Sequence, residues 1–315
     1  RMSESVYRIL RAWLESLTSG VVELDRDWRS PRAPRFTFGA QCPTPGGLSA
    51  DTGLMAAISS RYFVNSAGKI VFALTPEHGT EIDPERDTVF LAGDFNGWQD
   101  AVGREEWRLR PGVIDGERVL MWSGEAARFF DPPGQRFKFV TGNNLWLALP
   151  ADAPNIVRDE NGNLNRVLDA TRTGRHLWRF KLAQPHDLAE GWSVSWAHRP
   201  EAESVPIVPR NFFYELKTEL PLGALVRGGE TLFRLFAPRA RRVTLFFCDE
   251  LANQGDAQSF ELARRADAEG SAGVWEIAMA RNLHSWFYWY IIDGVREGAG
   301  RFDPTVRVLD PSALA

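Results

Sequence analysis

The sequence of 315 residues predicts a mainly β protein, with two antiparallel β-sandwich modules in tandem after a short helical N-terminal region. Short apolar runs separated by Gly, Asn, Asp and Pro recur over residues 61–170 and again over 211–315, and this is typical of antiparallel strands. The repeated strand–helix alternation of an α/β barrel is absent. Residues 171–210 are rich in proline and predict a linker between the modules.

The N-terminal region, residues 1–60, predicts one helix followed by an irregular connection. Apolar residues from Ser3 to Leu17 recur at i, i+3 and i+4, with Gly20 just past the end, which indicates an amphipathic helix. We expect it to pack against a neighbouring domain of the same chain, with a separate partner as the alternative. A second, short helix is expected at Thr52–Ser59.

The first module begins with a strand at Val89–Ala92, which is followed by the turn-forming sequence Gly93–Gly97 and then Trp98. Loops face solvent, so this indole is a candidate stacking surface for a ligand. The alternative is that Trp98 folds back and packs on the core.

A second strand is predicted at Arg136–Phe139, where the residues alternate in character. Successive side chains of a strand point to opposite faces, so Phe137 and Phe139 are expected in the core and Lys138 on the wet face.

After a turn the chain is expected to return as a strand in which Leu145, Leu147 and Leu149 enter the core. Trp146 would then share the wet face with Lys138. An exposed ring next to a flexible donor suits a polyhydroxylated ligand, because the ring covers the C–H face of a sugar and the ammonium bonds its hydroxyls. A segment rich in amide groups, Asn161–Asn165, precedes the next strand.

These elements together resemble the glycogen-binding module of the kinase β subunits that sense cellular energy, which belongs to carbohydrate-binding family 48. The resemblance covers residues of about 62–170 and rests on the Gly-Asp-Phe-Asn-Gly-Trp loop, the Phe-Lys-Phe strand, the Trp after the hairpin turn and the Gly-Asn-Leu-Asn segment. The chain departs from the family pattern by a longer insertion between Trp98 and Arg136, which is expected to lengthen or partly block the binding groove.

The resemblance implies an immunoglobulin-like sandwich that binds α-glucan, meaning glycogen, starch or a maltooligosaccharide. It makes Trp98 and Trp146 the stacking platforms, while Lys138 and Asn165 would bond sugar hydroxyls. Asn163 stands where the family often carries a small polar residue and is included as a further contact.

The linker contains a predicted strand at His176–Leu182 and two tryptophans, Trp192 and Trp196, four residues apart. We expect these indoles to pack on a domain. The alternative is an aromatic pair on the surface.

The second module contains four predicted strands, at Thr231–Pro238, Val243–Cys248, Gly273–Met279 and Trp286–Ile292. Residues of about 213–311 resemble the immunoglobulin-like module that precedes the catalytic barrel in pullulanases, isoamylases and related α-amylase-family enzymes. The last of these strands is apolar on both faces, which is typical of a strand covered on both sides. We therefore expect a structural module with one sheet face covered by another domain; the alternative is a second sugar site at Trp286 or Trp289.

Composition excludes several classes of function. A formal net charge of −4 lacks the basic footprint of a nucleic-acid binder, and no apolar run approaches the ~20 residues of a membrane span. The two cysteines, Cys42 and Cys248, form neither a disulfide framework nor a metal motif. We expect no metal, no cofactor, no nucleic-acid or membrane partner, and a cytoplasmic location.

No catalytic residues are predicted. Glycoside hydrolysis needs two carboxylates across the scissile bond, and none of the 41 Asp and Glu residues sits in such a pattern. The first hypothesis is a non-catalytic α-glucan-binding and scaffolding region of a larger debranching or pullulanase-type enzyme, with a catalytic barrel in cis. The chain ends at Ala315, just past the segment that leads into the barrel in that family, which favours this hypothesis. A stand-alone glycogen-targeting or regulatory protein, whose second module docks a partner, is the alternative, and a small enzyme of another type is the third.

Overall fold

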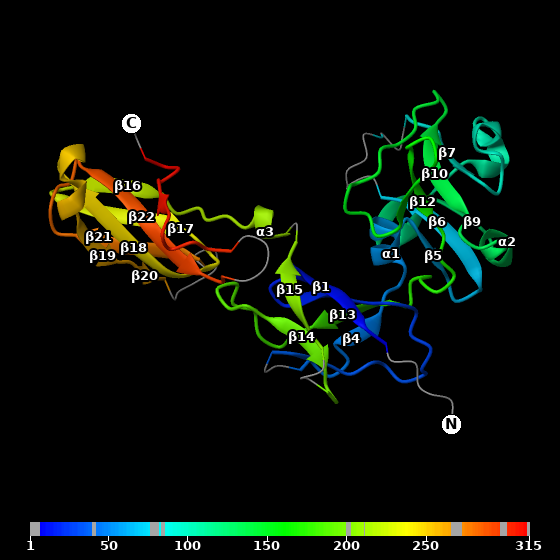
Figure 1. Cartoon of the computed structure of the whole chain (residues 1–315), viewed down its shortest axis with the longest axis horizontal. Helices are drawn as coiled ribbons and strands as arrows, with labels where there is room; N and C mark the ends of the chain where they lie inside the picture. Colours follow the sequence, from blue (N-terminus) through cyan, green and yellow to red (C-terminus); the bar gives the residue numbers. More distant parts are fainter. Residues whose placement is uncertain are drawn as a thin grey trace. The chain divides into compact units, whose positions relative to one another are not determined.

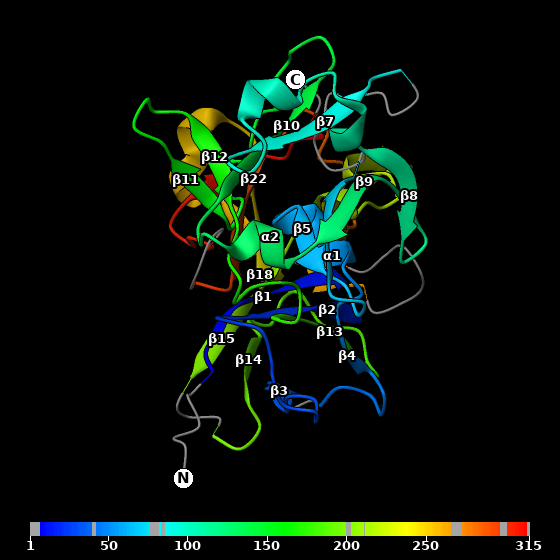
Figure 2. The ribbon, with the colours of Figure 1, turned by 90° about the vertical axis from the view of Figure 1, so that its right-hand side faces the viewer.

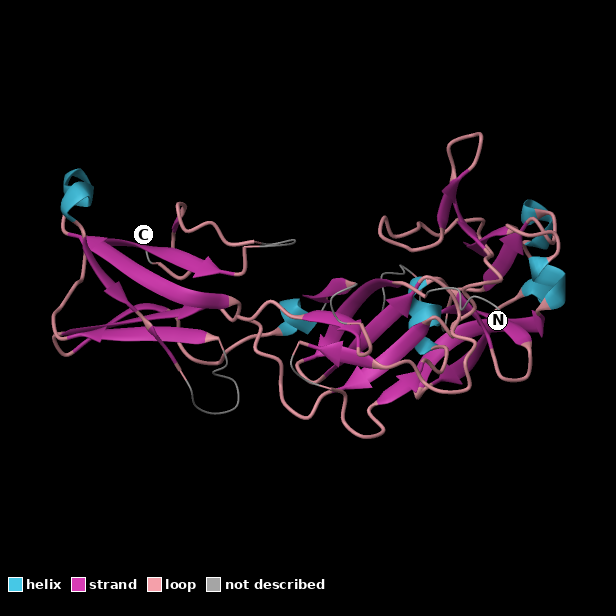
Figure 3. Ribbon diagram, turned by 60° about the horizontal axis from the view of Figure 1, so that its bottom comes forward, coloured by secondary structure: helices cyan, strands magenta, loops and turns pink. Residues whose placement is uncertain are grey.

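A computed structural model describes residues 7–39, 42–75, 82, 86–199, 203–210, 212–265, 273–296 and 301–313. In this part of the chain strands predominate and the helices are few and short, so the prediction of a mainly β protein is confirmed (Figures 1 and 3). The chain divides into two compact units. One comprises Arg1–Arg11, Val21–Arg35 and Pro43–Lys181, and the other comprises Ala12–Gly20, Phe36–Cys42 and Leu182–Ala315. None of the described helices is long and apolar enough to cross a membrane.

The first sandwich lies in the first unit and consists of two antiparallel sheets. One has the order β5-β6-β9-β8, formed by Tyr62–Val64, Lys69–Leu74, Glu117–Glu125 and Arg110–Ile114. The other has the order β11-β12-β10-β7, formed by Ile156–Arg158, Leu164–Val167, Arg136–Thr141 and Val89–Gly93. Figure 2 shows β10 beside β7. In their antiparallel pairing Phe137 lies opposite Gly93 and Thr141 lies opposite Val89. Phe72 of one sheet meets Phe137 of the other at a ring-centroid distance of 4.9 Å, so the sheets enclose one core.

The insertion between Trp98 and Arg136 helps to build this sandwich. It contains β8 and β9, two 3-10 turns at Trp98–Ala101 (η1) and Glu105–Trp107 (η2), and the short helix α2 at Ala127–Phe130. Trp107 is 5% exposed and stacks on Trp122 at 5.1 Å between ring centroids. The insertion therefore supplies half of one sheet and part of the core.

The second sandwich lies in the second unit and again has two antiparallel sheets. One has the order β16-β17-β21-β20, formed by Gly223–Arg227, Glu230–Phe236, Val274–Met279 and Ala263–Arg264. The other has the order β19-β18-β22-β23, formed by Gln258–Glu261, Ala240–Cys248, Phe287–Gly294 and Arg307–Val308. A 3-10 segment at Leu251–Asp256 (η3) follows β18. All four strands predicted for this module are present, and the prediction of two tandem sandwiches is confirmed.

The aromatic strand β22 has one face in the core, where Tyr290 is fully buried. On the other face Trp289 is 7% exposed, because Phe246 stacks on it at 5.7 Å and Arg307 covers it at 4.6 Å. The neighbouring Phe287 is 43% exposed. Since the Trp289 ring is covered within its own module, it offers no open plate for a sugar.

The helix predicted over Ser3–Leu17 is wrong. Residues 1–6 lie outside the described part of the chain, and Ile9–Ser16 forms strand β1, followed by strand β2 at Ser19–Leu24. β1 pairs in parallel with β15, placing Ala12 opposite Ile207. Ala12, Trp13 and Leu14 are buried in succession, as expected for a strand covered on both faces. β1 lies between β15, almost two hundred residues away, and the adjacent β2, and the distant neighbour could not be inferred from local periodicity.

The segments predicted as irregular connections contain further strands. These are β3 at Phe36–Phe38, β4 at Leu48–Ala50, β13 at Leu177–Lys181, β14 at Ser193–Trp196 and β15 at Ser204–Pro209. The predicted strand at His176–Leu182 is thus confirmed as β13, and the predicted short helix as α1 at Leu54–Ser59, with α3 at Phe212–Glu215 as another helical turn. Trp196 is 2% exposed and Trp192 lies 3.8 Å from the His186 ring, so both indoles pack as expected.

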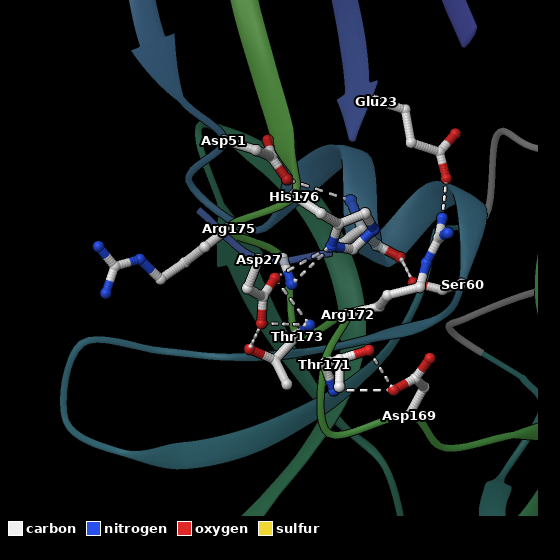
Figure 4. Close-up of polar contacts among 12 residues, drawn as sticks. Glu23, Asp27, Asp51, Ser60, Asp169, Thr171, Arg172, Thr173, Arg175 and His176 are labelled. Carbon is white, nitrogen blue, oxygen red and sulfur yellow. Dashed lines mark hydrogen bonds and ion pairs between the residues drawn. The ribbon is translucent and has the colours of Figure 1, made fainter. Parts of the chain in front are cut away.

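A polar cluster joins β2 to the segment that follows the first sandwich (Figure 4). Glu23 is 2% exposed and accepts hydrogen bonds from Arg11 and Arg172. Asp27 accepts bonds from the amide and the hydroxyl of Thr173, at 2.9 and 2.6 Å, and lies 3.2 Å from Nδ1 of His176. Burial raises the pKa of Asp27, but the bonds from His176 and Thr173 outweigh that effect and leave its pKa below the ordinary value.

Candidate functional site

All five residues predicted to bind sugar line one open depression of about 440 Å³ on the first sandwich. They are joined there by residues that the sequence analysis did not select. The lining consists of Trp98, Gln99, Arg136, Lys138, Trp146, Asp159, Asn163 and Asn165. We call this depression the aromatic groove.

The loop after β7 fixes the position of Trp98. Asn96 accepts a hydrogen bond from the Gly93 amide at 2.8 Å and donates one to the Leu91 carbonyl at 2.9 Å, which closes the turn. Gly97 and Trp98 both adopt left-handed backbone conformations, with φ of 75° and 55°. Such a conformation is strained for a tryptophan, and strain of this kind persists where the surroundings hold it.

Asp94 keeps Trp98 in this backbone conformation. It accepts a hydrogen bond from the Trp98 indole at 2.9 Å and a bidentate pair from the Arg136 guanidinium, each bond 3.0 Å long. Partial burial raises the pKa of Asp94, but the bonds from Arg136 and Trp98 act against it, and the pKa lies below the ordinary value. Asp94 therefore orients the Trp98 ring, although the sequence analysis included this residue only as part of a turn.

Trp146 lies on the segment that returns after β10. A single bridge pairs it with Val140, and the Leu147 amide donates to the Phe139 carbonyl at 3.0 Å. Its ring centroid is 6.0 Å from that of Trp98, with 46° between the ring planes. Both indoles are partly buried, because one side of each packs on the sandwich core. Together they form one bent aromatic surface.

One prediction for this return segment is wrong. Leu145 was expected in the core and is 55% exposed, whereas Leu147 is partly buried against the core. The segment forms one bridge in place of a continuous strand, so the alternation of faces does not extend to Leu145.

Lys138 lies on the wet face of β10, as predicted, while Phe137 and Phe139 are 0% and 4% exposed. Its ammonium makes no hydrogen bond or ion pair with the described residues. Partial burial lowers its pKa, and the nearby Asp159 carboxylate acts in the opposite direction. The group is thus a donor whose hydrogen-bonding capacity is available to a ligand.

Asp159 organises the amide side of the groove. It accepts bonds from the Asn163 amide at 2.8 Å and from the side-chain nitrogens of Asn163 and Asn165 at 3.3 and 3.2 Å. Asn165 is 5% exposed, whereas Asn163 is exposed. Asn163 is therefore the more accessible contact, and Asn165 mainly supports the turn.

Sequence reasoning missed Gln99, Arg136 and Asp159 as members of the groove. Arg136 was named only as the first residue of a predicted strand. Gln99 is positioned by the hydrogen bond that its side chain donates to Oδ1 of Asn144, 2.9 Å away in a turn distant in sequence. The signal for Asp159 was present, since an Asp ahead of an Asn-Gly turn commonly accepts the backbone amides that follow it.

Replacing Asp94 should weaken ligand binding at the groove without removing any stacking ring. In Asp94→Ala the indole and the guanidinium lose their common acceptor, and we expect affinity for a maltooligosaccharide to fall about fivefold, the value of about one hydrogen bond. In the wild type the carboxylate is charged above the ordinary pKa of Asp, so affinity should be constant down to about pH 4 and fall at lower pH, as the group protonates. Calorimetric titrations from pH 7 to 3 measure both effects; an Asp94→Ala variant with unchanged affinity would contradict this role.

Comparison with protein families identifies the class of the second module. Residues 221–313 match the family model of carbohydrate-binding module 48, described as the isoamylase N-terminal domain. The second sandwich is therefore similar to modules of this type. No curated protein matches the chain.

Solved structures similar to the chain include several pullulanases. The pullulanase from Bacillus acidopullulyticus is 16% identical over 91% of this chain and 34% of its own, with a TM-score of 0.35. The Group B Streptococcus pullulanase SAP is 20% identical over 52% of this chain and 21% of its own, with a TM-score of 0.31. The Paenibacillus barengoltzii pullulanase in complex with maltohexaose and α-cyclodextrin is 26% identical over 26% of this chain and 12% of its own, with a TM-score of 0.22. The chain spans about a third of these proteins or less, and at these TM-scores the superpositions carry no argument about its site.

Proposed function

We propose that the first sandwich binds α-glucan chains through the aromatic groove. We further propose that the chain is a non-catalytic binding and scaffolding region of a larger pullulanase- or debranching-type enzyme. The observation that carries the first proposal is the contact between the Trp98 and Trp146 rings beside an ammonium with no partner among the described residues.

The geometry of the groove suits a curved chain of sugars. Each glucose presents a C–H face that stacks on an indole, and α-linked glucan bends along its length. Two planes inclined by 46° can therefore follow neighbouring parts of one chain better than a flat surface could. Lys138, Gln99 and Asn163 stand around the rings and can bond the hydroxyls at the edges of the sugars.

The carboxylates at the groove do not support hydrolysis. Asp159 accepts bonds from Asn163 and Asn165 through its side-chain oxygens, and Asp94 is paired with Arg136. Both carboxylates are thus used to hold other residues of the groove in place. This supports a binding role for the described part of the chain, and the family match of residues 221–313 supports a parent enzyme that acts on α-glucans.

The test is titration of the full chain with maltoheptaose. We expect a Kd in the millimolar to micromolar range, or about −4 to −8 kcal/mol, with no release of reducing sugar from pullulan or amylopectin. Because the ligand is neutral, a tenfold rise in ionic strength should change the Kd less than about twofold. Absence of binding at 10 times the upper limit of this range, or turnover by the purified chain, would overturn the proposal.

A further inference from the structure

Two side-chain amides meet at the aromatic groove. Gln99 lines the groove directly after Trp98, and its Nε2 donates a hydrogen bond to Oδ1 of Asn144 at 2.9 Å. Asn144 precedes Trp146 by two residues. The bond therefore joins the turn that carries one indole to the turn that leads into the other, and we call Gln99 and Asn144 the amide pair.

Turns hold the backbone of both members of the amide pair. Gln99 lies in η1, where its carbonyl accepts a hydrogen bond from the Val102 amide at 3.2 Å. The Asn144 amide donates to the Thr141 carbonyl at 2.9 Å. Asn144 has a left-handed backbone with φ of 64°, which asparagine adopts more readily than most residues. Because both backbones are held, the bond between the side chains also fixes the directions of the two amide groups.

The amide pair retains hydrogen-bonding capacity after this bond is made. Both side chains are exposed. Oε1 of Gln99 accepts no hydrogen bond, and Nδ2 of Asn144 donates none, within the part of the chain that the structure describes. One acceptor and one donor thus remain on two neutral groups that are bonded to each other. Two neighbouring hydroxyls are complementary to them, since one hydroxyl can donate while the other accepts.

We propose that the amide pair recognises the C2 and C3 hydroxyls of one glucose unit in the groove. Oε1 of Gln99 accepts from one of these hydroxyls, and Nδ2 of Asn144 donates to the other. This role depends on the glucan binding proposed for the aromatic groove and adds a specificity element to it. A glucose whose C–H face lies on an indole presents its equatorial hydroxyls at the edge of the sugar ring, so their partners must lie beside the indole, where Gln99 is found.

The linkage of the glucan determines which hydroxyls are available. In an α-1,4-linked chain, the C2 and C3 hydroxyls are the only free hydroxyls on adjacent carbons of an internal unit, because the oxygen on C4 takes part in the linkage. Methylation at O2 and O3 leaves oxygens that can still accept from Nδ2 of Asn144, but it removes the hydrogen that Oε1 of Gln99 accepts. The contribution of Gln99 should therefore depend on free hydroxyls at these two positions.

Calorimetric titration of the full chain with methylated β-cyclodextrins tests this role. The wild type should bind the 2,3-di-O-methyl derivative about tenfold more weakly than the 6-O-methyl derivative, the value of one to two hydrogen bonds. Gln99→Met has a side chain of similar size without the acceptor, so this preference should fall about threefold or more in the variant. A preference as large in Gln99→Met as in the wild type would show that methyl groups only obstruct the groove, and it would overturn the proposal.

Asn144→Gly tests the other member of the pair, because glycine suits the left-handed backbone and lacks the amide. This variant and Gln99→Met should each weaken maltoheptaose binding about fivefold. The double variant should lose less than about 25-fold, since the two amides act as a unit. Asn143→Ala is the matched control: Asn143 is exposed in the same turn, makes no side-chain hydrogen bond with the described residues, and should be replaced without loss of affinity.

The outcomes separate this role from the function on which it depends. If the wild type binds neither maltoheptaose nor β-cyclodextrin, the glucan site and the role of the amide pair are both refuted. If the wild type binds both ligands, and Gln99→Met and Asn144→Gly bind maltoheptaose like the wild type, only the role of the amide pair is refuted.

Discussion

Trp146→Ala should weaken the binding of maltoheptaose about 30-fold. The ring is one half of the bent aromatic surface, and loss of an interface hot spot of this kind costs about 2 kcal/mol. Trp98→Ala should have an effect of similar size. Isothermal titration of the full chain measures both, and quenching of indole fluorescence by the ligand should fall in each variant.

The double variant tests whether the two rings act together. Because their centroids are 6.0 Å apart, each ring helps to position the other, and the double replacement should cost less than the sum of the single ones. Trp28→Ala is the matched control, since Trp28 is also partly exposed and lies in the same unit but outside the groove. If Trp146→Ala folds and binds maltoheptaose like the wild type, the groove is not the glucan site.

Glu23→Ala should lower the free energy of unfolding of the first unit by about 3 kcal/mol, a large loss for the replacement of one charged residue. The carboxylate is 2% exposed and its two oxygens are bonded by Arg11 and Arg172, which come from β1 and from the segment after the first sandwich. Replacing the buried carboxylate by a methyl group breaks both of its ion pairs at once, which is strongly destabilising. Denaturant unfolding of the full chain, followed by the transition of the first unit, measures the effect.

Two variants make this stability prediction specific. Glu23→Gln keeps the shape and one acceptor, so it should cost about half as much as Glu23→Ala. Glu117→Ala, on the exposed edge of β9, should change the free energy of unfolding by less than about 0.5 kcal/mol. An equal, small effect of all three replacements would show that the cluster in Figure 4 does not hold the N-terminal strands in place.

A family match supports a sugar-binding role for the second sandwich, whereas an exposed pair of indoles supports it for the first. The second matches a family model described as a carbohydrate-binding module, yet its Trp289 ring is covered by Phe246 and Arg307. The first carries the open pair of indoles, outside the residues that the family model matches. We therefore propose that the first sandwich binds glucan and that the second has a structural role. Titration of Trp289→Ala and Trp146→Ala side by side distinguishes these assignments.

Local sequence predicted several elements of the fold and the site correctly. Phe137 and Phe139 alternate with Lys138, so a strand that buries the two rings must place Lys138 on its solvent-facing side. The same reasoning failed at Leu145, where the pairing ends after one bridge. Periodicity also failed at Ile9–Ser16, because a strand covered on both sides and a helix can share the same apolar spacing.

Local sequence patterns were enough to predict the two sandwiches, their strands β7, β10, β17, β18, β21 and β22, and the residue types of the groove, because turn chemistry and alternation of faces are local properties of the chain. The arrangement in which Asp94 and Arg136 hold Trp98, and the pairing of β1 with β15, became evident only in the folded structure. These features depend on residues far apart in the chain, and their energies come from desolvation and pairing that exist only once the chain has folded.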